Sequence, residues 1–288
     1  PIPTYVALNS PYINAGTMEN KGWEATINYK TKIGKLGVNI TALVSDVVNN
    51  VTSLPGIPYL DGGSVRTAVG QPLFSYFGYK ALGYFQSDAD ILAAPTHFFV
   101  PKPGDIRYAD LNGDGKVDAN DRTFIGNNFP RYEYSLNMNF NYGNFDLSIF
   151  LQGVGKRENY LTGTGAYPFY AADFIPGLLE MHKDYWTAAN PNAKFPRLLP
   201  AIGVNGTTSS FWIRDAAYVR VKNVNLSYRL PENWMKKVNI KSAKVFISGQ
   251  NLYTFTKFWE GYDPEINNQN AEFYPLMKTI TGGININF

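Results

Sequence analysis

The clearest feature of the chain is an alternation of apolar and polar residues with a period of two. In residues 131–142, RYEYSLNMNFNY, every second side chain is apolar and the side chains between them are polar. After a turn at Gly143-Asn144, residues 144–156 alternate in the same way. A helix repeats every 3.6 residues and cannot produce this pattern, whereas an extended strand does. The two segments therefore predict a tight β-hairpin.

Further segments alternate in the same manner and are predicted strands: 22–30, 36–49, 216–230, 242–255 and 278–288. In 216–230 the phase changes near Asn223, and a β-bulge there would restore the two faces of the strand. The chain is therefore expected to be all-β.

Strands of this kind fit two architectures. In a soluble sandwich the apolar face forms the core, whereas in an outer-membrane barrel it meets lipid and the polar face lines the lumen. Strand lengths of about 10 residues or more favour the barrel. So do the aromatic residues near strand ends, which are Tyr132, Tyr134, Tyr142 and Tyr228. We expect residues 1–288 to be the C-terminal part of a large antiparallel transmembrane β-barrel, with about seven membrane strands.

The connections alternate between short and very long, which orients the predicted barrel. The long ones are 50–130, 157–215 and 256–277, and the short ones are 31–35, 143–144 and 231–241. Barrels of this kind have short periplasmic turns and long extracellular loops. We therefore expect three extracellular excursions and a periplasmic C-terminus.

The number of predicted strands has two consequences. The strand-like segment 70–85 is assigned to the first excursion, because one more membrane crossing would break the parity of the strands. The smallest barrels need about eight strands, so the missing strands are expected upstream, in a longer protein.

Composition excludes several other classes of protein. The formal charge is +3 and the basic residues are scattered, so no nucleic-acid surface is indicated. There are no cysteines, which excludes disulfides and thiolate metal sites. No apolar run is long enough for a transmembrane helix. The only histidines, His97 and His182, lie in predicted loops without a paired catalytic group, so we expect them to be structural and the protein not to be an enzyme.

Residues 110–121, DLNGDGKVDAND, match a calcium-binding loop of about 12 residues. In such a loop, oxygen ligands at alternate positions surround a hard cation, and a glycine, here Gly115, permits the sharp turn. The predicted ligands are Asp110, Asn112, Asp114, the backbone carbonyl of Lys116, Asp118 and Asp121.

Asp121 stands where a longer glutamate is usual, so the choice between calcium and magnesium is left open. The ion would stabilise a long outer loop and take no part in catalysis. The alternative is a turn rich in Asp, Asn and Gly that holds no ion.

Aromatic residues in the predicted outer loops are candidate cargo contacts, because aromatic faces stack on sugar rings. They are Trp186, Phe211, Trp212, Phe258 and Trp259. The same residues could instead pack the loops together, or against a capping partner.

The C-terminal residues TGGININF place Thr281, Gly283, Ile286 and Phe288 in an alternating strand that ends on an aromatic residue. This arrangement resembles the C-terminal signal that the barrel-assembly machinery of bacterial outer membranes recognises.

Taken together, the segments resemble the C-terminal portion of a SusC/RagA-type TonB-dependent outer-membrane transporter of Bacteroidetes. The segments that carry the resemblance are ENKGWEATINY, VGQPLFSYFGYKALGYFQS, PGDIRYADLNGDGKVDANDRTFIGN, FDLSIFLQGVG, DAAYVRVKNVNLSYRLP and KVFISGQNLYTFTKFWEGYDPE. They occur in the family's order and cover most of the chain.

The resemblance implies a barrel of about 22 strands, closed by a plug domain and preceded by a segment that contacts TonB. Neither the plug nor that segment is in this chain. It also implies a SusD-like lipoprotein that caps the outer mouth, and a nutrient cargo that is usually an oligosaccharide and sometimes a peptide. We therefore expect TonB-dependent import of an oligosaccharide across the outer membrane.

Two alternatives stay open at the level of sequence. One is a secreted or surface-bound calcium-binding β-sandwich that binds glycans. The other is a surface hydrolase that uses a carboxylate pair such as Asp263 and Glu265.

Overall fold

The computed structural model describes residues 16–169, 177–199, 202–237, 239–266 and 274–288. Parts of the expected excursions 157–215 and 256–277, one residue of the turn 231–241 and the first residues of the expected barrel portion 1–288 lie outside the described residues. The described chain is mainly β structure. None of its helices is long and apolar enough to cross a membrane.

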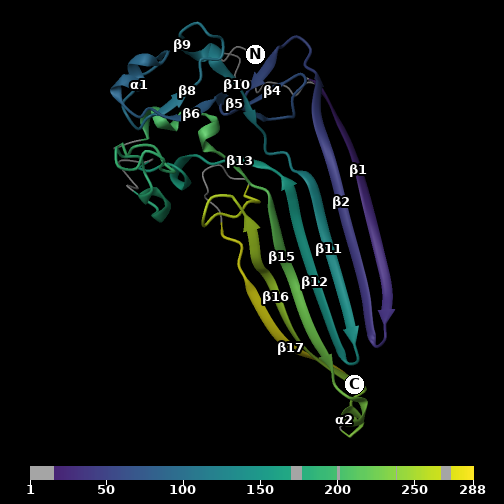
Figure 1. The fold of residues 1–288 in the computed structure, drawn as a ribbon. Helices are drawn as coiled ribbons and strands as arrows, with labels where there is room; N and C mark the ends of the chain where they lie inside the picture. Colours follow the sequence, from purple (N-terminus) through teal and green to yellow (C-terminus); the bar gives the residue numbers. More distant parts are fainter. Residues whose placement is uncertain (1–15, 170–176, 200–201, 238, 267–273) are drawn as a thin grey trace, which may run out of the picture.

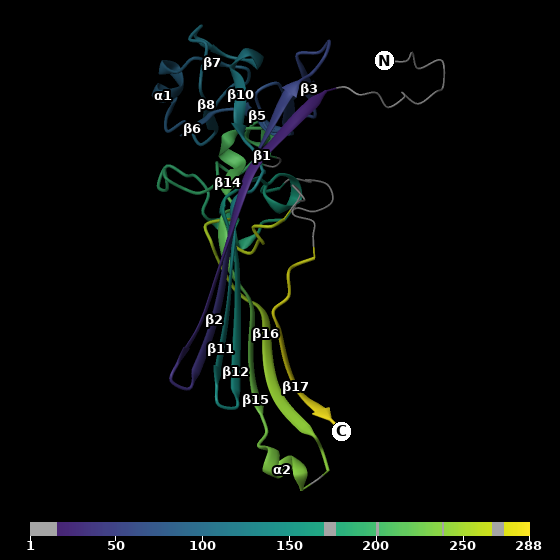
Figure 2. The ribbon, with the colours of Figure 1, turned by 90° about the vertical axis from the view of Figure 1, so that its right-hand side faces the viewer.

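Seven long strands form one antiparallel sheet, and their order in the sheet follows their order in the sequence (Figures 1 and 2). The strands are β1 (Thr17–Ile33), β2 (Leu36–Ser53), β11 (Arg131–Tyr142), β12 (Phe145–Lys156), β15 (Tyr218–Arg229), β16 (Ser242–Thr256) and β17 (Thr279–Asn287). Each predicted strand segment is present, and β1 and β2 are longer than predicted. Among the described residues, β1 and β17 each pair on one side only, so the sheet is open.

One face of this sheet is apolar across all seven strands. Residues paired directly across antiparallel strands project from the same face, so the register assigns each side chain to a face. One row of paired residues, from β1 to β17, is Tyr29, Ile40, Met138, Ile149, Val224, Gly249 and Ile280. The neighbouring row, on the opposite face, is Lys30, Asn39, Asn139, Ser148, Asn225, Ser248 and Thr281.

Side chains on the polar face form hydrogen bonds with one another, whereas side chains on the apolar face are left exposed. On the polar face, side chains bond across strands: Ser148 Oγ donates to Asn139 Oδ1 (2.7 Å), and Asn28 Nδ2 donates to Thr41 Oγ1 (2.7 Å). On the apolar face, Ile280 is 73% exposed. Large apolar side chains of the strands are thus left open on a face that no described segment covers at these positions.

A β-bulge lies at the position that the sequence indicates. Leu151 and Tyr253 pair with Val221, and Phe150 and Gln250 pair with Asn223, so Lys222 is left without a partner on either side. The extra residue keeps the residues before and after it on their proper faces.

The first long connection forms small sheets of its own. One has the order β10-β5-β4-β3, made of β3 (Tyr59–Asp61), β4 (Val65–Ala68), β5 (Ser75–Tyr79) and β10 (Arg122–Gly126). Two further pairs are β6 (Ala81–Tyr84) with β8 (Ile106–Tyr108), and β7 (Thr96–His97) with β9 (Lys116–Val117). The segment 70–85 holds β5 and β6, neither of which joins the seven-stranded sheet. Helix α1 spans Asp88–Ala93.

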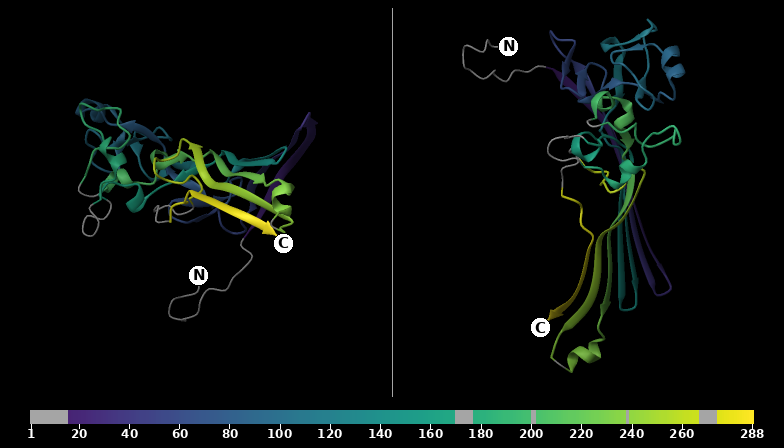
Figure 3. Two further views of the ribbon diagram at one scale, coloured as in Figure 1. Left: turned by 90° about the horizontal axis from the view of Figure 1, so that it is seen from below. Right: turned by 90° about the vertical axis from the view of Figure 1, so that its left-hand side faces the viewer.

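The other connections contain short elements. In the second, β13 (Glu158–Tyr160) pairs with β14 (Ile213–Asp215), and 3-10 turns span Gly163–Gly165, Glu180–Lys183, Gly203–Gly206 and Ser210–Trp212. Helix α2 (Glu232–Lys236) lies in the turn between β15 and β16. The long connections gather at one end of the strands and α2 lies at the other, as Figure 3 shows.

The long connections share one hydrophobic core. Tyr76, Ile106, Tyr108 and Val117 come from the first connection, Tyr160, Leu161, Phe195 and Trp212 from the second, and Phe258, Trp259 and Ile266 from the third. We call this group the loop core. The main buried cluster of the described chain therefore lies in the connections, at the end of the sheet.

Candidate functional site

The predicted metal loop is closed by hydrogen bonds between its own side chains and backbone. The Asp110 carboxylate accepts from the N–H groups of Gly113 (2.7 Å) and Gly115 (2.9 Å), and Asp114 accepts from the N–H of Lys116 (2.9 Å). Gly115 has a φ of +82°, so it makes the turn that the sequence assigns to it.

Asp121 lies at the centre of this loop and is fully buried. Its Oδ1 accepts from the N–H groups of Leu111 (2.7 Å) and Asn112 (3.3 Å), and its Oδ2 accepts from the N–H of Asp118 (2.8 Å). Burial acts to raise the pKa of Asp121, but these three N–H groups outweigh burial and lower the pKa below its ordinary value. The ionised carboxylate therefore joins the two ends of the loop.

A cation in this loop would use the oxygen lone pairs that the backbone leaves free. Carboxylate and amide oxygens are suitable ligands for calcium or magnesium. In the described part of the chain, however, no three acidic or histidine side chains converge as a ready metal site. The metal site stays a prediction, since the loop is also closed without an ion.

The aromatic cargo candidates lie mainly inside the loop core or against it. Trp186, Trp212, Phe258 and Trp259 are buried, and Phe211 is half-buried. Trp212 Nε1 donates to the carbonyl oxygen of Asn205 (2.8 Å), and the ring of Trp259 stacks on that of Phe195 (centroids 5.2 Å apart).

These contacts are the packing role that the sequence left open for the aromatic residues. Phe258 and Trp259 also reach a cavity of about 520 Å³ beside β16. Contact between any of these rings and cargo stays a prediction.

Arg220 is the largest charged group buried in the strands, and it holds the third connection to β15. Its Nη2 donates to both oxygens of Asp263 (2.7 Å each), its Nη1 donates to Glu265, and its Nε donates to Thr254 Oγ1 (2.9 Å). The Tyr218 hydroxyl donates to the other oxygen of Glu265 (2.7 Å). Arg220 is fully buried, so this network replaces its hydration.

This network argues against a hydrolase that uses Asp263 and Glu265 as its catalytic carboxylates. A glycosidase needs one carboxyl free to protonate the leaving group and another free to attack or to activate water. Here both carboxylates bind the same guanidinium. The pair is placed to anchor a loop.

A second buried pair joins the first two long connections. Arg197 donates to both oxygens of Asp105 (2.7 and 3.1 Å), and Asn205 Nδ2 donates to Asp105 Oδ1 (3.1 Å). Asp105 is fully buried. Residues 105 and 197 are far apart in the sequence, so this contact fixes one connection against the other.

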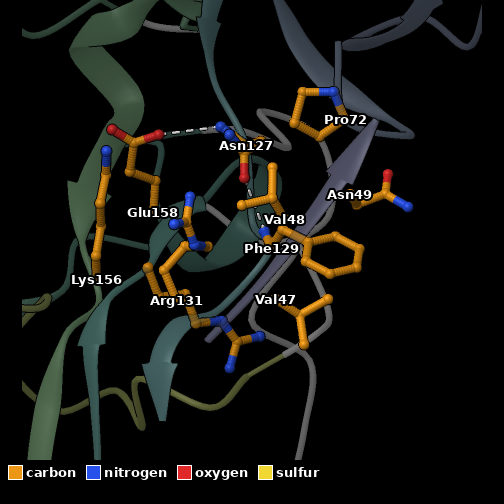
Figure 4. Close-up of a pocket in the computed structure, with 10 residues that line it drawn as sticks. Val47, Val48, Asn49, Pro72, Asn127, Phe129, Arg131, Lys156 and Glu158 are labelled. Carbon is orange, nitrogen blue, oxygen red and sulfur yellow. Dashed lines mark hydrogen bonds between the residues drawn. The ribbon is translucent and has the colours of Figure 1, made fainter. Parts of the chain in front are cut away.

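A third joint lies where the loop region meets the sheet, beside a small cavity of about 60 Å³ (Figure 4). Glu158 Oε2 accepts from the backbone N–H of Asn127 (3.0 Å), and Asn127 Oδ1 accepts from the N–H of Phe129 (3.0 Å). Nearby, Arg131 of β11 donates to the buried carboxylate of Asp46 on β2. The Glu158 contact therefore joins the first two connections, and the Arg131 contact joins β11 to β2.

Both histidines have structural contacts. His182 is 1% exposed; its Nδ1 accepts from the N–H of Leu179 (3.1 Å) and its Nε2 donates to the carbonyl oxygen of Ala166 (3.1 Å). His97 is buried, and its Nε2 accepts from the N–H of Tyr108 (3.2 Å). Burial lowers the pKa of both rings.

The residues proposed as an assembly signal lie at the free edge of the sheet. Thr281, Gly283 and Ile286 are on β17 and Phe288 follows it, with Phe288 80% exposed. Gly283 lies under the ring of Phe246, where a Cβ atom would come within 2.6 Å of a ring carbon. Recognition of this strand during assembly stays a prediction.

Sequence reasoning missed the arginines that form these ion pairs. Arg131, Arg197 and Arg220 look like ordinary polar positions of strands or loops, and their partners lie 43 to 92 residues away. One signal in the sequence could have indicated the Arg220 pair: a charged residue near the loop end of a strand, followed by the acidic residues Asp263 and Glu265 in a later loop.

An open antiparallel sheet with one apolar and one polar face, and with its long connections at one end, is typical of part of a large barrel wall. Comparison with known proteins agrees with this class. The chain is 30% identical over 317 residues to TonB-dependent receptor P3 of Formosa agariphila, covering 100% of this chain and 30% of that protein. It is 23% identical over 296 residues to TonB-dependent receptor SusC of Bacteroides thetaiotaomicron, covering 96% of this chain and 27% of that protein.

Solved structures show the same fold. The RagAB peptide transporter matches with a TM-score of 0.78 and 20% identity, over 99% of this chain and 31% of that one. No protein-family model matches the chain. The resemblance to a SusC/RagA-type TonB-dependent transporter is confirmed. The chain spans less than a third of the length of these relatives.

The Arg220 network yields a prediction for stability. Arg220→Ala should lower the free energy of opening of residues 257–266 by about 3 kcal/mol, because two carboxylates lose their shared counter-charge. Hydrogen exchange of these amides in the full-length parent protein would measure it. Lys183→Ala is the control. The ion pair of Lys183 with Glu180 is exposed, so this substitution should change the free energy of opening by less than about 0.5 kcal/mol. Equal effects of the two substitutions would contradict the anchoring role.

The buried histidines yield a pH dependence. In an unfolded loop a histidine titrates near pH 6.5, whereas burial lowers the pKa of His182 in the folded loop. Above about pH 6.5 neither state binds the proton, so this contribution to stability is fully present. Below that pH the unfolded state binds it more readily, so hydrogen-exchange protection near His182 should fall as the pH falls from 7.5 to 5. His182→Gln should flatten this dependence, and an unchanged slope in that variant would refute it.

Proposed function

We propose that this chain is part of the barrel of a TonB-dependent transporter that imports a nutrient across the bacterial outer membrane. The observation that carries the proposal is the continuous apolar row across seven strands in a chain that matches TonB-dependent receptors over its whole length. The complete barrel would have about 22 strands. This chain would supply part of its wall, with outer-membrane lipid against the apolar face.

The apolar face argues for a membrane role over the sandwich alternative. In a soluble sandwich, the apolar faces of two sheets pack against each other about 10 Å apart. Here the described residues provide no second sheet over that face, and Ile27 and Ile247 are 69% and 54% exposed. Lipid is a solvent in which such a surface is stable.

The orientation follows from the lengths of the connections. We place the three long connections outside the cell and the turn that contains α2 in the periplasm, together with the C-terminus. The loop core would then stiffen the outer mouth, where a SusD-like lipoprotein would cap the barrel. The plug and the TonB-contacting segment would belong to parts of the protein outside this chain. The barrel-assembly machinery would recognise β17 through Thr281, Gly283, Ile286 and Phe288.

The cargo we propose is a nutrient oligomer, with an oligosaccharide as the first candidate. One solved structure of the same fold is a peptide transporter by its own description, so a peptide is the second candidate. We propose that Phe258 and Trp259 contact the cargo, and the support is that both line a cavity as well as the loop core.

We further propose that residues 110–121 bind calcium or magnesium, through Asp110, Asn112, Asp114, Lys116, Asp118 and Asp121. The support is the agreement of ligand types and spacing with a known loop. The ion would lie in the first long connection, whose residues Tyr108 and Val117 belong to the loop core.

The membrane role is tested by paired substitutions on β16. Ile247 and Ser248 are adjacent and project from opposite faces of the sheet, because Ile247 pairs with Leu226 and Ser248 pairs with Asn225. Ile247→Lys should strongly reduce recovery of the full-length protein in the outer membrane, since a lysine on the lipid face costs about 2–4 kcal/mol at the midplane. Ser248→Lys should assemble normally. Fractionation with detection by antibody would measure both, and equal recovery of the two variants would contradict the assignment of faces.

Transport is tested in cells that carry the parent gene or its deletion, with TonB present or removed. Uptake of a labelled oligosaccharide mixture should require both the gene and TonB, and a labelled peptide mixture serves as the alternative cargo. Uptake of both mixtures that is independent of the gene would refute the proposed function.

The metal proposal is tested by removing the ion. Calcium added after chelation should slow hydrogen exchange of residues 110–121. Asp114→Asn should raise the half-saturating calcium concentration at least tenfold. Asp88→Asn, an exposed carboxylate in α1, is the matched control and should change nothing. Exchange that is unaffected by calcium or magnesium would show that the loop is closed by its own hydrogen bonds alone.

A further inference from the structure

Arg214, on β14, is a half-buried guanidinium that forms no ion pair with a described acidic residue. Its central carbon lies 4.4 Å from the centre of the Trp259 ring and 5.3 Å from that of Phe211. Its Nη1 donates to the carbonyl oxygens of Ile213 (3.0 Å) and Phe211. Two aromatic rings and two carbonyl groups therefore fix the orientation of this side chain.

The other half-buried or buried arginines named so far are paired. Arg197 binds Asp105 and Arg220 binds Asp263 and Glu265, each through two or more hydrogen bonds. Arg214 has no such partner, and burial lowers the pKa of its guanidinium. Its Nε and Nη2 form no hydrogen bond with a described residue and are not among the buried unpaired atoms. Nε and Nη2 are therefore the donors that the described residues leave unused.

Arg214 is one of the residues that line a cavity of about 640 Å³, a volume within the size range of small-ligand sites. Lys156 and Arg157 also line it, and so do Glu158 and Asp215. The two acids are engaged with backbone: Glu158 Oε2 accepts from the N–H of Asn127 (3.0 Å), and Asp215 Oδ1 accepts from the N–H of Ala217 (2.9 Å). Lys156 and Arg214 are the basic groups of this cavity that form no ion pair with a described acidic residue.

We propose that this cavity binds a carboxylate-bearing ligand, with Arg214 donating from Nε and Nη2 to the two carboxylate oxygens. The planar guanidinium matches a carboxylate in this two-point geometry, and Lys156 adds a flexible positive charge on the same cavity. The inference rests on the proposed transport function and narrows it: the cargo carries a carboxylate, as an acidic sugar or a free peptide C-terminus does.

The test uses the full-length parent protein in detergent, labelled with 5-fluorotryptophan. Because Arg214 contacts Trp259, fluorine NMR of Trp259, assigned with Trp259→Phe, reports ligand binding beside Arg214. The probes are glucuronate against glucose, N-acetylglycine against its neutral amide, and inorganic phosphate. We expect one or both carboxylates to shift the Trp259 resonance and their neutral partners to leave it unchanged. The two carboxylates differ in the rest of the molecule, so their affinities distinguish a sugar from a peptide source.

Variants separate binding at Arg214 from a general charge effect. Arg214→Gln should weaken carboxylate binding at least tenfold, and Arg214→Lys should weaken it less, because an ammonium keeps the charge without the two-point geometry. Lys183→Gln, an exposed lysine elsewhere in the second connection, should have no effect. If Arg214→Gln disturbs folding, the exposed Lys156→Gln serves in its place, with an expected weakening of about threefold.

Equal binding of the neutral probes, unchanged affinity in these variants, or binding of phosphate without either carboxylate would overturn the inference. Binding in detergent does not require transport, so the two proposals fail separately. If the protein binds the carboxylates but uptake does not depend on its gene, the transporter proposal fails. If uptake depends on the gene but the carboxylates do not bind, only the carboxylate site fails.

Discussion

The strand register is the constraint on which the rest of the structure depends. Side chains alternate with a period of two, so a slip of one residue between any two neighbours would carry a strand's apolar side chains to the polar face. The rows from Tyr29 to Ile280 and from Lys30 to Thr281 keep their character across seven strands. The bulge at Lys222 is part of this constraint, because without it the two halves of β15 would face opposite ways.

The loop core depends on the sheet for its position and supplies the stability that an exposed sheet lacks. Its residues come from three connections that are far apart in sequence, and each connection begins and ends at neighbouring strands. Arginine–carboxylate pairs, each with one fully buried partner, then fix the connections to one another and to the strands, through Asp105 with Arg197 and Asp263 with Arg220. In the proposed transporter, this assembly would lie at the outer mouth of the barrel and would keep that mouth rigid around cargo.

Local pattern predicted much of the fold and little of the site. The strands, the hairpin at Gly143 and the bulge near Asn223 follow from residues close in sequence, and the structure contains them. The separate status of 70–85 follows from the parity of the strand count, and neither strand of that segment joins the seven-stranded sheet. Burial of Trp212 and the pairing of Arg220 depend on partners brought together by tertiary structure, which no single segment specifies. The calcium loop is the reverse case: its pattern is local, but its ion is not part of the chain.

The central claim is that one face of the sheet meets lipid, and a cysteine scan tests it most directly. This chain has no cysteine, so once any cysteine elsewhere in the full-length protein is replaced by serine, single cysteines at positions 244–248 of β16 can each carry an environment-sensitive fluorophore. In the full-length protein in lipid bilayers, labels at 245 and 247 should be blue-shifted and quenched by lipid-borne quenchers, while labels at 244, 246 and 248 should be quenched only from water. Our account predicts that quenching from lipid and quenching from water alternate from one position of β16 to the next, with the odd-numbered positions facing lipid. Uniform quenching from water along the strand would contradict it.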